Sequence, residues 1–167
     1  ASVLGLEAVL ADGTVISSMN RMIQNNAAYD LKQLFIGSEG TLGVITRLVL
    51  RLREAPRSTQ TAMVACTEFG DVTQLLKHMD AALGGALSAF EVMWNDFYRL
   101  VTTPPAKGSP PLGQDHPYYV LLESSGGEAT RDQAQFEAAL GEAIEAGLVA
   151  DAVIASSEAQ RGALWAL

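Results

Sequence analysis

Residues 29–46 read Tyr29-Asp30-Leu31-Lys32-Gln33-Leu34-Phe35-Ile36-Gly37-Ser38-Glu39-Gly40-Thr41-Leu42-Gly43-Val44-Ile45-Thr46. Within this segment Gly37, Gly40 and Gly43 are evenly spaced and allow the backbone to turn sharply. They also let a ligand reach main-chain N–H groups, which bind phosphate or ring heteroatoms. The segment is neither a Walker loop nor a dinucleotide fingerprint, because Gly-x-x-x-x-Gly-Lys and Gly-x-Gly-x-x-Gly are both absent. Two interpretations follow: a tight connection between strands, or a loop that binds a ligand.

The sequence on either side of this segment predicts strands. Residues 4–11 and 14–17 flank Asp12-Gly13, a turn dipeptide whose glycine tolerates positive φ, so we expect a β-hairpin. Asp30 lies where its carboxylate could cap the short helical turn that follows it. Residues 44–53 form a β-branched run that alternates apolar with basic side chains in its second half, which indicates one long strand with a solvated face.

A boundary near residue 57 begins the second part of the chain. Pro56 has no amide hydrogen to donate and must end any central strand, and most of the negative charge lies after residue 60. From there strands and helices alternate in a β-α-β, β-α-β order, which commonly folds as an antiparallel sheet with its helices on one face, the ferredoxin-like layout. A proline-rich stretch, residues 104–111, is expected to be a mobile loop. The predicted strands are residues 61–67, 87–93, 118–124 and 150–155, and the predicted helices are residues 70–83, 95–101 and 130–146 and a last one from Ser157.

The composition excludes several functional classes. The chain has 167 residues, 49% of them hydrophobic, and a mean hydropathy of +0.16, so it can bury a core. A net charge of −8 without a basic stripe argues against nucleic acid binding. Cys66 is the single cysteine and the two histidines are isolated, so neither a disulfide nor a self-contained metal site is expected. Glu142, Glu145 and Asp151 interrupt the most apolar stretch, so we expect no transmembrane helix.

Residues 31–46 resemble the segment that ends the flavin-binding domain in the vanillyl-alcohol oxidase and p-cresol methylhydroxylase (PCMH) superfamily. Residues 3–15 resemble the hairpin before it, and three further stretches resemble cap-domain segments: residues 87–93, 118–126 and 164–167. The subgroup that the chain resembles most is that of D-2-hydroxyglutarate and D-lactate dehydrogenases. The resemblance implies an α+β fold, in which residues 1–57 are the C-terminal part of a PCMH-type FAD-binding domain. Residues 58–167 are then an incomplete, ferredoxin-like antiparallel α/β cap domain.

The resemblance also implies an activity and a cofactor. A D-2-hydroxy acid would be oxidised by hydride transfer from C2 to N5 of FAD, while a base takes the hydroxyl proton. No catalytic residue and no metal ligand is assigned within the chain. Glu39 has a second interpretation, in which its carboxylate holds the loop by hydrogen bonds to the loop's own amides. The implied FAD-binding residues, with main-chain contacts centred on the last three, are Glu39, Gly40, Thr41, Leu42, Gly43, Val44 and Ile45.

By the same resemblance, much of the enzyme lies outside these residues. The family's pyrophosphate loop would precede Ala1, and an arginine that binds the substrate carboxylate would follow Trp165-Ala166-Leu167, with metal-binding histidines and catalytic residues further on. We therefore expect a fragment that binds FAD weakly or not at all, turns over no substrate and self-associates through surface exposed by truncation. The implied partners of the parent are a small 2-hydroxy acid and an electron acceptor. A soluble, cytoplasmic location is expected, or a mitochondrial one if the parent is eukaryotic.

Two alternatives stay open. The chain could be a non-catalytic, acidic α/β binding module, or a family member with another substrate such as glycolate or an alkyl-glycerone-phosphate. Neither the charge nor the motifs decide between substrates.

Several other side chains have structural roles as their first interpretation. His78 and His116 are expected at or near the surface, and Cys66 as a small buried apolar residue without a basic neighbour to lower its pKa. Glu91 lies within an apolar strand and therefore needs a partner or water. A nearby cluster is assigned to the core, with the wall of a substrate pocket as the second interpretation: Met93, Trp94, Phe97 and Tyr98.

Overall fold

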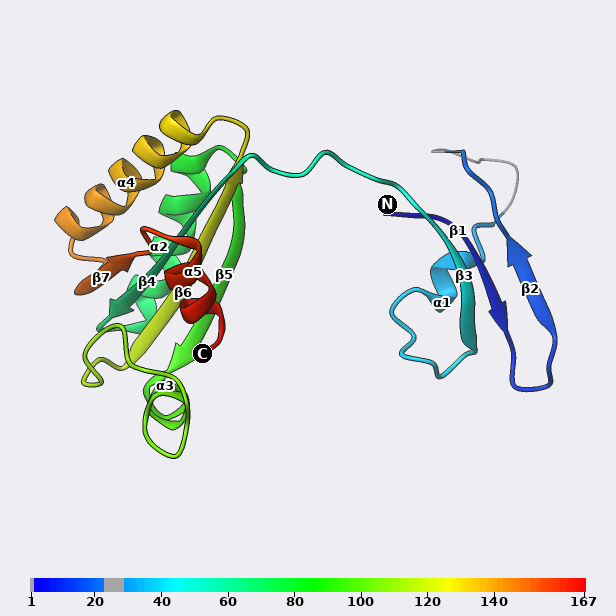
Figure 1. Ribbon diagram of the computed structural model, residues 1–167, viewed down its shortest axis with the longest axis horizontal. Coiled ribbons are helices and arrows are strands. Elements are labelled where there is room, and N and C mark those ends of the chain that lie inside the picture. Colours follow the sequence, from blue (N-terminus) through cyan, green and yellow to red (C-terminus); the bar gives the residue numbers. More distant parts are fainter. Residues whose placement is uncertain (1, 23–28) are drawn as a thin grey trace. The chain divides into compact units, whose positions relative to one another are not determined.

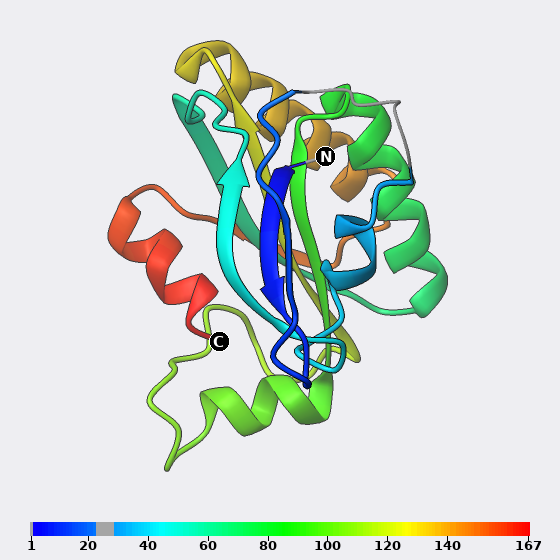
Figure 2. The same cartoon turned by 90° about the vertical axis from the view of Figure 1, so that its right-hand side faces the viewer.

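The computed structural model describes residues 2–22 and 29–167 and separates the chain into two compact units, residues 1–55 and 56–167 (Figure 1). The first unit is a three-stranded antiparallel sheet in the order β2-β1-β3, with a short helix, α1, against β1 (Figure 2). Its small core consists of Leu6, Ala8 and Phe35. The elements of this unit are β1 (Val3–Val9), β2 (Val15–Ser18), α1 (Lys32–Phe35) and β3 (Val44–Leu50).

The hairpin expected at Asp12-Gly13 is present. Gly13 has a φ of 84°, and the Asp12 carboxylate accepts a hydrogen bond of 2.9 Å from the amide of Thr14. That bond holds the pKa of Asp12 below its usual value. The local turn chemistry is therefore sufficient to pair β1 with β2.

Two local predictions in this unit are wrong. The Asp30 carboxylate does not cap α1: the cap residue is Leu31 without a side-chain bond, and Asp30 instead binds the side chains of Lys32 and Gln33. Strand β3 ends at Leu50 rather than at residue 53: Leu50 pairs with Val3, the first residue of β1, and one further bond of 2.8 Å, from the amide of Arg51 to the carbonyl of Ser2, ends the pairing. A strand continues only as far as its partner supplies hydrogen bonds.

The second unit is a four-stranded antiparallel sheet in the order β5-β6-β4-β7, the ferredoxin-like topology expected from the sequence. Helices α2 and α4 lie side by side across one face (Figures 1 and 2). The elements are β4 (Ser58–Cys66), α2 (Phe69–Leu83), β5 (Leu87–Trp94), α3 (Asn95–Thr102), β6 (Tyr118–Gly126), α4 (Ala129–Glu145), β7 (Asp151–Ile154) and α5 (Glu158–Trp165).

The boundaries of the two long helices follow from their end residues. Glu68 and Asp71 form a reciprocal capping box at the start of α2, and Gly84 ends that helix in the left-handed conformation. The carboxylate of Glu128 accepts hydrogen bonds from the amides of Thr130 and Arg131 and so begins α4. These groups are adjacent in sequence, which is why both helices lie within one residue of their predicted limits.

Each face of the second sheet carries its own core. Alternate residues of β4 and β6, including Val64 and Leu122, pack under α2 and α4. The other set, including Met63 and Leu121, packs with Tyr98 and Leu164 on the opposite face, beside α3 and α5. This second face positions the groove described below.

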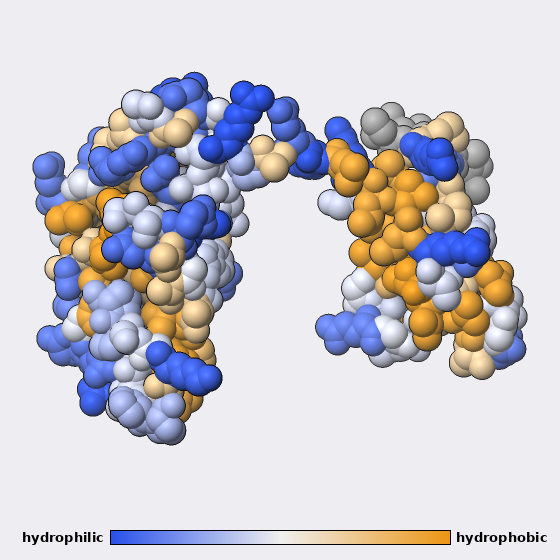
Figure 3. Space-filling view, viewed as in Figure 1, coloured by the Kyte–Doolittle hydropathy of each residue, from blue (hydrophilic) through white to orange (hydrophobic). Residues whose placement is uncertain are grey.

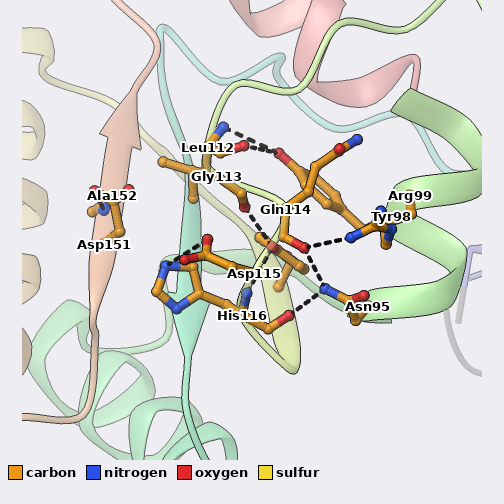
Figure 4. A network of polar contacts seen from close by, with 11 residues as sticks. Asn95, Tyr98, Arg99, Leu112, Gly113, Gln114, Asp115, His116, Asp151 and Ala152 are labelled. Atoms are coloured by element: carbon orange, nitrogen blue, oxygen red, sulfur yellow. Dashed lines mark hydrogen bonds and ion pairs between the residues drawn. The ribbon is translucent and has the colours of Figure 1, made fainter. Parts of the chain in front are cut away.

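The connection between α3 and β6 is held in place over residues 112–116 by hydrogen bonds from Asn95 and Tyr98 of α3. The ring of Tyr98 stacks on that of Tyr119 with centroids 3.7 Å apart. The Tyr98 hydroxyl donates to the carbonyl of Leu112 and accepts from its amide, both at 3.1 Å, and the Asn95 amide donates to the carbonyls of Gln114 and His116 (Figure 4). Burial raises the pKa of both tyrosines, as expected for hydroxyls kept neutral inside the protein.

We predict that Tyr98→Phe lowers the free energy of unfolding of the second unit by about 1–3 kcal/mol, because both backbone polar groups of Leu112 lose a buried partner. Urea unfolding followed by far-ultraviolet circular dichroism measures the change. Tyr118→Phe is the matched control, since it removes a hydroxyl that makes no hydrogen bond among the described residues. Equal stability of the two variants would contradict the prediction.

A second prediction concerns Cys66, which is fully buried. Burial raises the pKa of its thiol from 9.0 to about 11, with a smaller contribution from Asp71. The unfolded state therefore loses the thiol proton at lower pH than the native state, so this contribution to stability is complete below about pH 9 and is lost as the pH rises toward about 11. The difference in unfolding free energy between wild type and Cys66→Ala should shrink from about pH 8 to about pH 10.5. A difference in unfolding free energy that stays constant across this pH range would refute the prediction.

Candidate functional site

The glycine-rich segment of the first unit forms a loop that holds itself by short-range bonds. The amide and hydroxyl of Ser38 donate to the carbonyl of Phe35 at 3.2 and 2.9 Å, and the amide and hydroxyl of Thr41 donate to the carbonyl of Ser38 at 3.0 and 2.7 Å. Gly37 and Gly40 have φ values of 78° and 82°. The loop thus has a defined shape without any ligand.

The residues predicted to bind a ligand lie together, five in this loop and two at the start of β3. The amides of Glu39, Gly40 and Leu42 donate to no acceptor among the described residues. Leu42 and Val44 are 51% and 66% exposed. Free donors beside exposed apolar side chains suit a planar apolar group with acceptor atoms on its edge.

Glu39 does not have the structural role that was its second interpretation. Its carboxylate makes no hydrogen bond or ion pair with any described residue, and so does not brace the loop. Its backbone has a φ of 51°, in the left-handed region that non-glycine residues seldom adopt. Glu39 is exposed to solvent.

Two glycines of the segment serve different purposes. A Cβ on Gly43 would lie 2.8 Å from the carbonyl oxygen of Val9 and 3.3 Å from the ring of Phe35, so Gly43 is needed for packing against β1. A Cβ on Gly40 would meet nothing within 4 Å. Open space beside Gly40, rather than Gly43, is therefore where a ligand can approach the main chain.

A cavity in the same unit lies elsewhere. It has a volume of about 300 Å³ and lies between β1, β2 and α1, with Leu6, Ile16 and Phe35 among its lining residues. None of residues 39–45 lines it. The predicted residues thus form an exposed surface and not a pocket within this unit.

Apolar side chains cover much of the visible face of the first unit (Figure 3). A three-stranded sheet with a four-residue helix can cover little of its own surface. Large side chains remain exposed on α1, on the loop and along β3, namely Leu31, Leu34, Ile36, Leu42, Val44, Ile45, Leu48 and Leu50.

The second unit contains an apolar groove of about 560 Å³ on the face of its sheet that α2 and α4 do not cover. Strands β5 and β6 form its floor, with Met93 and Leu121, and α3 contributes Phe97. Trp165 and Leu167 come from the end of the chain. Of the four residues assigned to the core, Met93 and Tyr98 are buried, whereas Trp94 and Phe97 are 57% and 47% exposed. All of them except Tyr98 line the groove, as the second interpretation expects.

Glu91 is the one charged residue that lines the groove. Of the two expected possibilities, a protein partner or water, the structure shows water: Glu91 is exposed and makes no ion pair or hydrogen bond with the described residues. Strand β5 forms an edge of the sheet, so the side chain reaches water. The groove is therefore apolar with a solvated carboxylate at its side.

The remaining candidates have structural roles. Nε2 of His78 lies 2.8 Å from the carbonyl oxygen of Ala139 and links α2 to α4. The ring of His116 meets that of Tyr119 edge-on, within the network that fixes the α3–β6 connection. A buried Cys66 thiol with a raised pKa is a poor nucleophile.

The part of the chain that the structure describes contains neither a metal site nor a membrane-spanning helix. It contains no group of three or more His, Cys, Asp or Glu side chains placed to hold a metal ion. Nor does any of its helices have the length and apolar character needed to cross a bilayer.

Comparison with known proteins gives a family and several relatives. The model of the family "FAD linked oxidases, C-terminal domain" matches residues 55–167. The mitochondrial D-2-hydroxyglutarate dehydrogenase of Bos taurus is 41% identical over 99% of the chain, and a putative mitochondrial D-lactate dehydrogenase of Schizosaccharomyces pombe is 37% identical over 98%. The chain spans 30% and 31% of the lengths of these two proteins.

Solved structures with the same fold are more distant in sequence. An alkyldihydroxyacetonephosphate synthase matches with a TM-score of 0.62 and 14% identity, covering 96% of this chain and 30% of that one. p-Cresol methylhydroxylase with substrate bound matches with a TM-score of 0.59 and 9% identity, covering 99% of this chain and 37% of that one. Both confirm the mixed α/β fold expected from the resemblance. The extent of the family match, over the whole of the second unit, shows that the chain belongs to the FAD linked oxidases, C-terminal domain family.

Proposed function

We propose that the chain is part of an FAD-dependent dehydrogenase that oxidises a D-2-hydroxy acid such as D-2-hydroxyglutarate or D-lactate. The observation that carries this proposal is the 41% identity with a D-2-hydroxyglutarate dehydrogenase across 99% of the chain, because it includes both units. In this proposal residues 1–57 end the FAD-binding domain and residues 58–167 begin the cap domain on the substrate side. The relatives described as mitochondrial favour the same location for a eukaryotic parent.

In the same proposal the loop of the first unit lines FAD. Residues 39–45 offer main-chain donors at Glu39, Gly40 and Leu42, and apolar contact at Leu42 and Val44. An isoalloxazine ring has apolar faces and acceptor atoms along one edge, which these groups match. FAD, when bound, supplies the acceptor at N5 for the hydride from C2 of the hydroxy acid.

In this proposal the apolar groove of the second unit is the part of the cap domain that contacts the substrate. Met93, Leu121 and Trp165 exclude water from one side of a bound molecule and fix its orientation by packing. The carboxylate of a hydroxy acid needs a cation, and the residues that line the groove include none. In this proposal the cation that binds the substrate carboxylate and the catalytic base are therefore not among the residues that line the groove.

The names of two relatives suggest which electron acceptor and which alternative substrate to test. One relative, from Saccharomyces cerevisiae, is a D-2-hydroxyglutarate–pyruvate transhydrogenase that is 35% identical over 98% of the chain. A keto acid is thus one class of acceptor to test beside artificial dyes. D-Lactate is tested as an alternative substrate because of the S. pombe relative.

We predict that Val44→Asp lowers the FAD content of the full-length protein at least about tenfold, since a carboxylate replaces an apolar contact to the flavin. Val44 is 66% exposed, so the isolated chain should keep its stability. Ile144→Asp, at an exposed position on α4, makes the same chemical change on the face away from the groove and should leave FAD bound. Visible absorbance of bound flavin per protein is the measurement, and equal FAD content in both variants would exclude a flavin contact at Val44.

The function is tested by comparing two purified proteins, the 167-residue chain and the full-length gene product. The full-length protein should bind FAD, and D-2-hydroxyglutarate or D-lactate should bleach the flavin under anaerobic conditions. The short chain should lack flavin colour, show no turnover with dichlorophenolindophenol or pyruvate as acceptor, and self-associate through the exposed apolar surface of its first unit.

The controls are the L-2-hydroxy acids and the same proteins with added FAD. Light scattering reports the self-association. A full-length protein that binds no flavin, or whose flavin no D-2-hydroxy acid reduces, would sink the proposal. A monodisperse short chain that binds a protein partner would favour the binding-module alternative instead.

A further inference from the structure

One carboxylate beside the groove, that of Glu123, binds three side chains from two other elements. Glu123 belongs to β6 and faces the same side of the sheet as Tyr119 and Leu121. Its side chain is 14% exposed. A carboxylate this well covered must be matched by donors or opposite charge.

The donors come from strand β4 and helix α5. Oε2 of Glu123 accepts a hydrogen bond of 2.9 Å from the hydroxyl of Thr61 and one of 2.7 Å from the indole Nε1 of Trp165. The Nη1 atom of Arg161 lies 3.7 Å from the same oxygen. Glu123 therefore joins the sheet to both polar side chains on the inner side of α5.

Few other contacts hold α5 in place. Leu164 is the only buried residue of this helix among the described residues. Ser157 caps the helix by accepting from the amide of Gln160, which fixes where it begins but not how it lies on the sheet. Arg161 also binds Glu158 through Nε at 3.1 Å and Nη2 at 2.7 Å, and these contacts raise its pKa, so it remains charged. The rotation of α5 about its axis thus depends on Leu164 and Glu123.

Trp165 connects this network to the groove. Its ring lines the groove with Leu164 and Leu167, and its N–H is a lone donor whose partner is Glu123. An indole whose one polar atom is bonded has its ring plane fixed as well. Without the carboxylate, the ring can rotate, and the groove loses a defined wall.

We propose that Glu123 is a positioning residue that sets the orientation of Trp165 and thereby the shape of the apolar groove. Glu123 does not line the groove, so it acts through Trp165. The consequence for substrate binding rests on the proposed function: Glu123 then tunes the affinity for the hydroxy acid through the ring that packs against it. A change in KM with a smaller change in kcat is the kinetic signature of lost positioning in binding.

The test measures tryptophan fluorescence of the 167-residue chain, which contains two tryptophans, Trp94 and Trp165. All variants carry Trp94→Phe, so that the fluorescence comes from Trp165 alone. Glu123→Ala should raise the acrylamide quenching constant of Trp165 about twofold, because the released indole turns into solvent. Glu123→Gln keeps an oxygen that accepts a weaker bond, so its constant should lie between those of wild type and Glu123→Ala. If Glu123→Ala fails to fold by circular dichroism, Glu123→Gln carries the comparison.

Two controls separate positioning from general stability. Thr61→Val removes another hydrogen bond to the same oxygen without touching Trp165, and should leave the quenching constant at the wild-type value. Glu145→Ala, at an exposed position on α4, matches the change in charge. The proposal is overturned if neither Glu123 variant changes the quenching of Trp165, or if Thr61→Val changes it equally.

The full-length enzyme tests the consequence for substrate. Glu123→Gln should raise KM for D-2-hydroxyglutarate or D-lactate about fivefold, with a smaller change in kcat. An unchanged KM would overturn the link to substrate binding. Absence of hydroxy-acid oxidation by the wild-type enzyme would instead refute the proposed function, and the quenching result would still decide the role of Glu123.

Discussion

The second unit depends on one strand that is buried on both faces. All five residues from Ala62 to Cys66 in β4 have no exposed surface. Three of them point to the core under α2 and α4, and two point to the core beside α3 and α5. Because β4 pairs with β6 along its length and with β7 on its other edge, its register fixes which residues of both neighbours face which core. A shift of one residue would exchange the two faces of the sheet.

That register brings the groove and its support together. Met63 and Leu121 lie on the same face, so Glu123, two residues after Leu121, lies there too. Thr61 on β4 is directly opposite Glu123 in the pairing and donates to it. Arg161 and Trp165 of helix α5 then contact the Glu123 carboxylate, whose position is set by the strand pairing of the sheet. The groove is thus a consequence of strand pairing and not of any local motif.

Features decided by neighbouring residues were predictable from the sequence, and those decided across the chain were not. The turn at Asp12-Gly13 and the start of α4 need only adjacent groups. The end of β3 depends on where β1 begins to pair, and the partners of Glu123 lie 62 and 42 residues away. The failed cap at Asp30 shows a third case, in which a cationic neighbour, Lys32, competes for the carboxylate.

The charges near the groove bear on where a substrate carboxylate could bind if the proposed function holds. Arg161 is the cation of α5, and it is bonded to Glu158 and close to Glu123, so it is not free to bind a substrate carboxylate. Glu91, the charged residue of the groove, would repel one. Under the proposed function, a hydroxy acid in this groove would turn its apolar part toward Trp165 and its carboxylate away from Glu91. Under the proposed function, the groove would then supply shape and exclusion of water, while neutralisation of the substrate's charge would need a cation that does not line the groove.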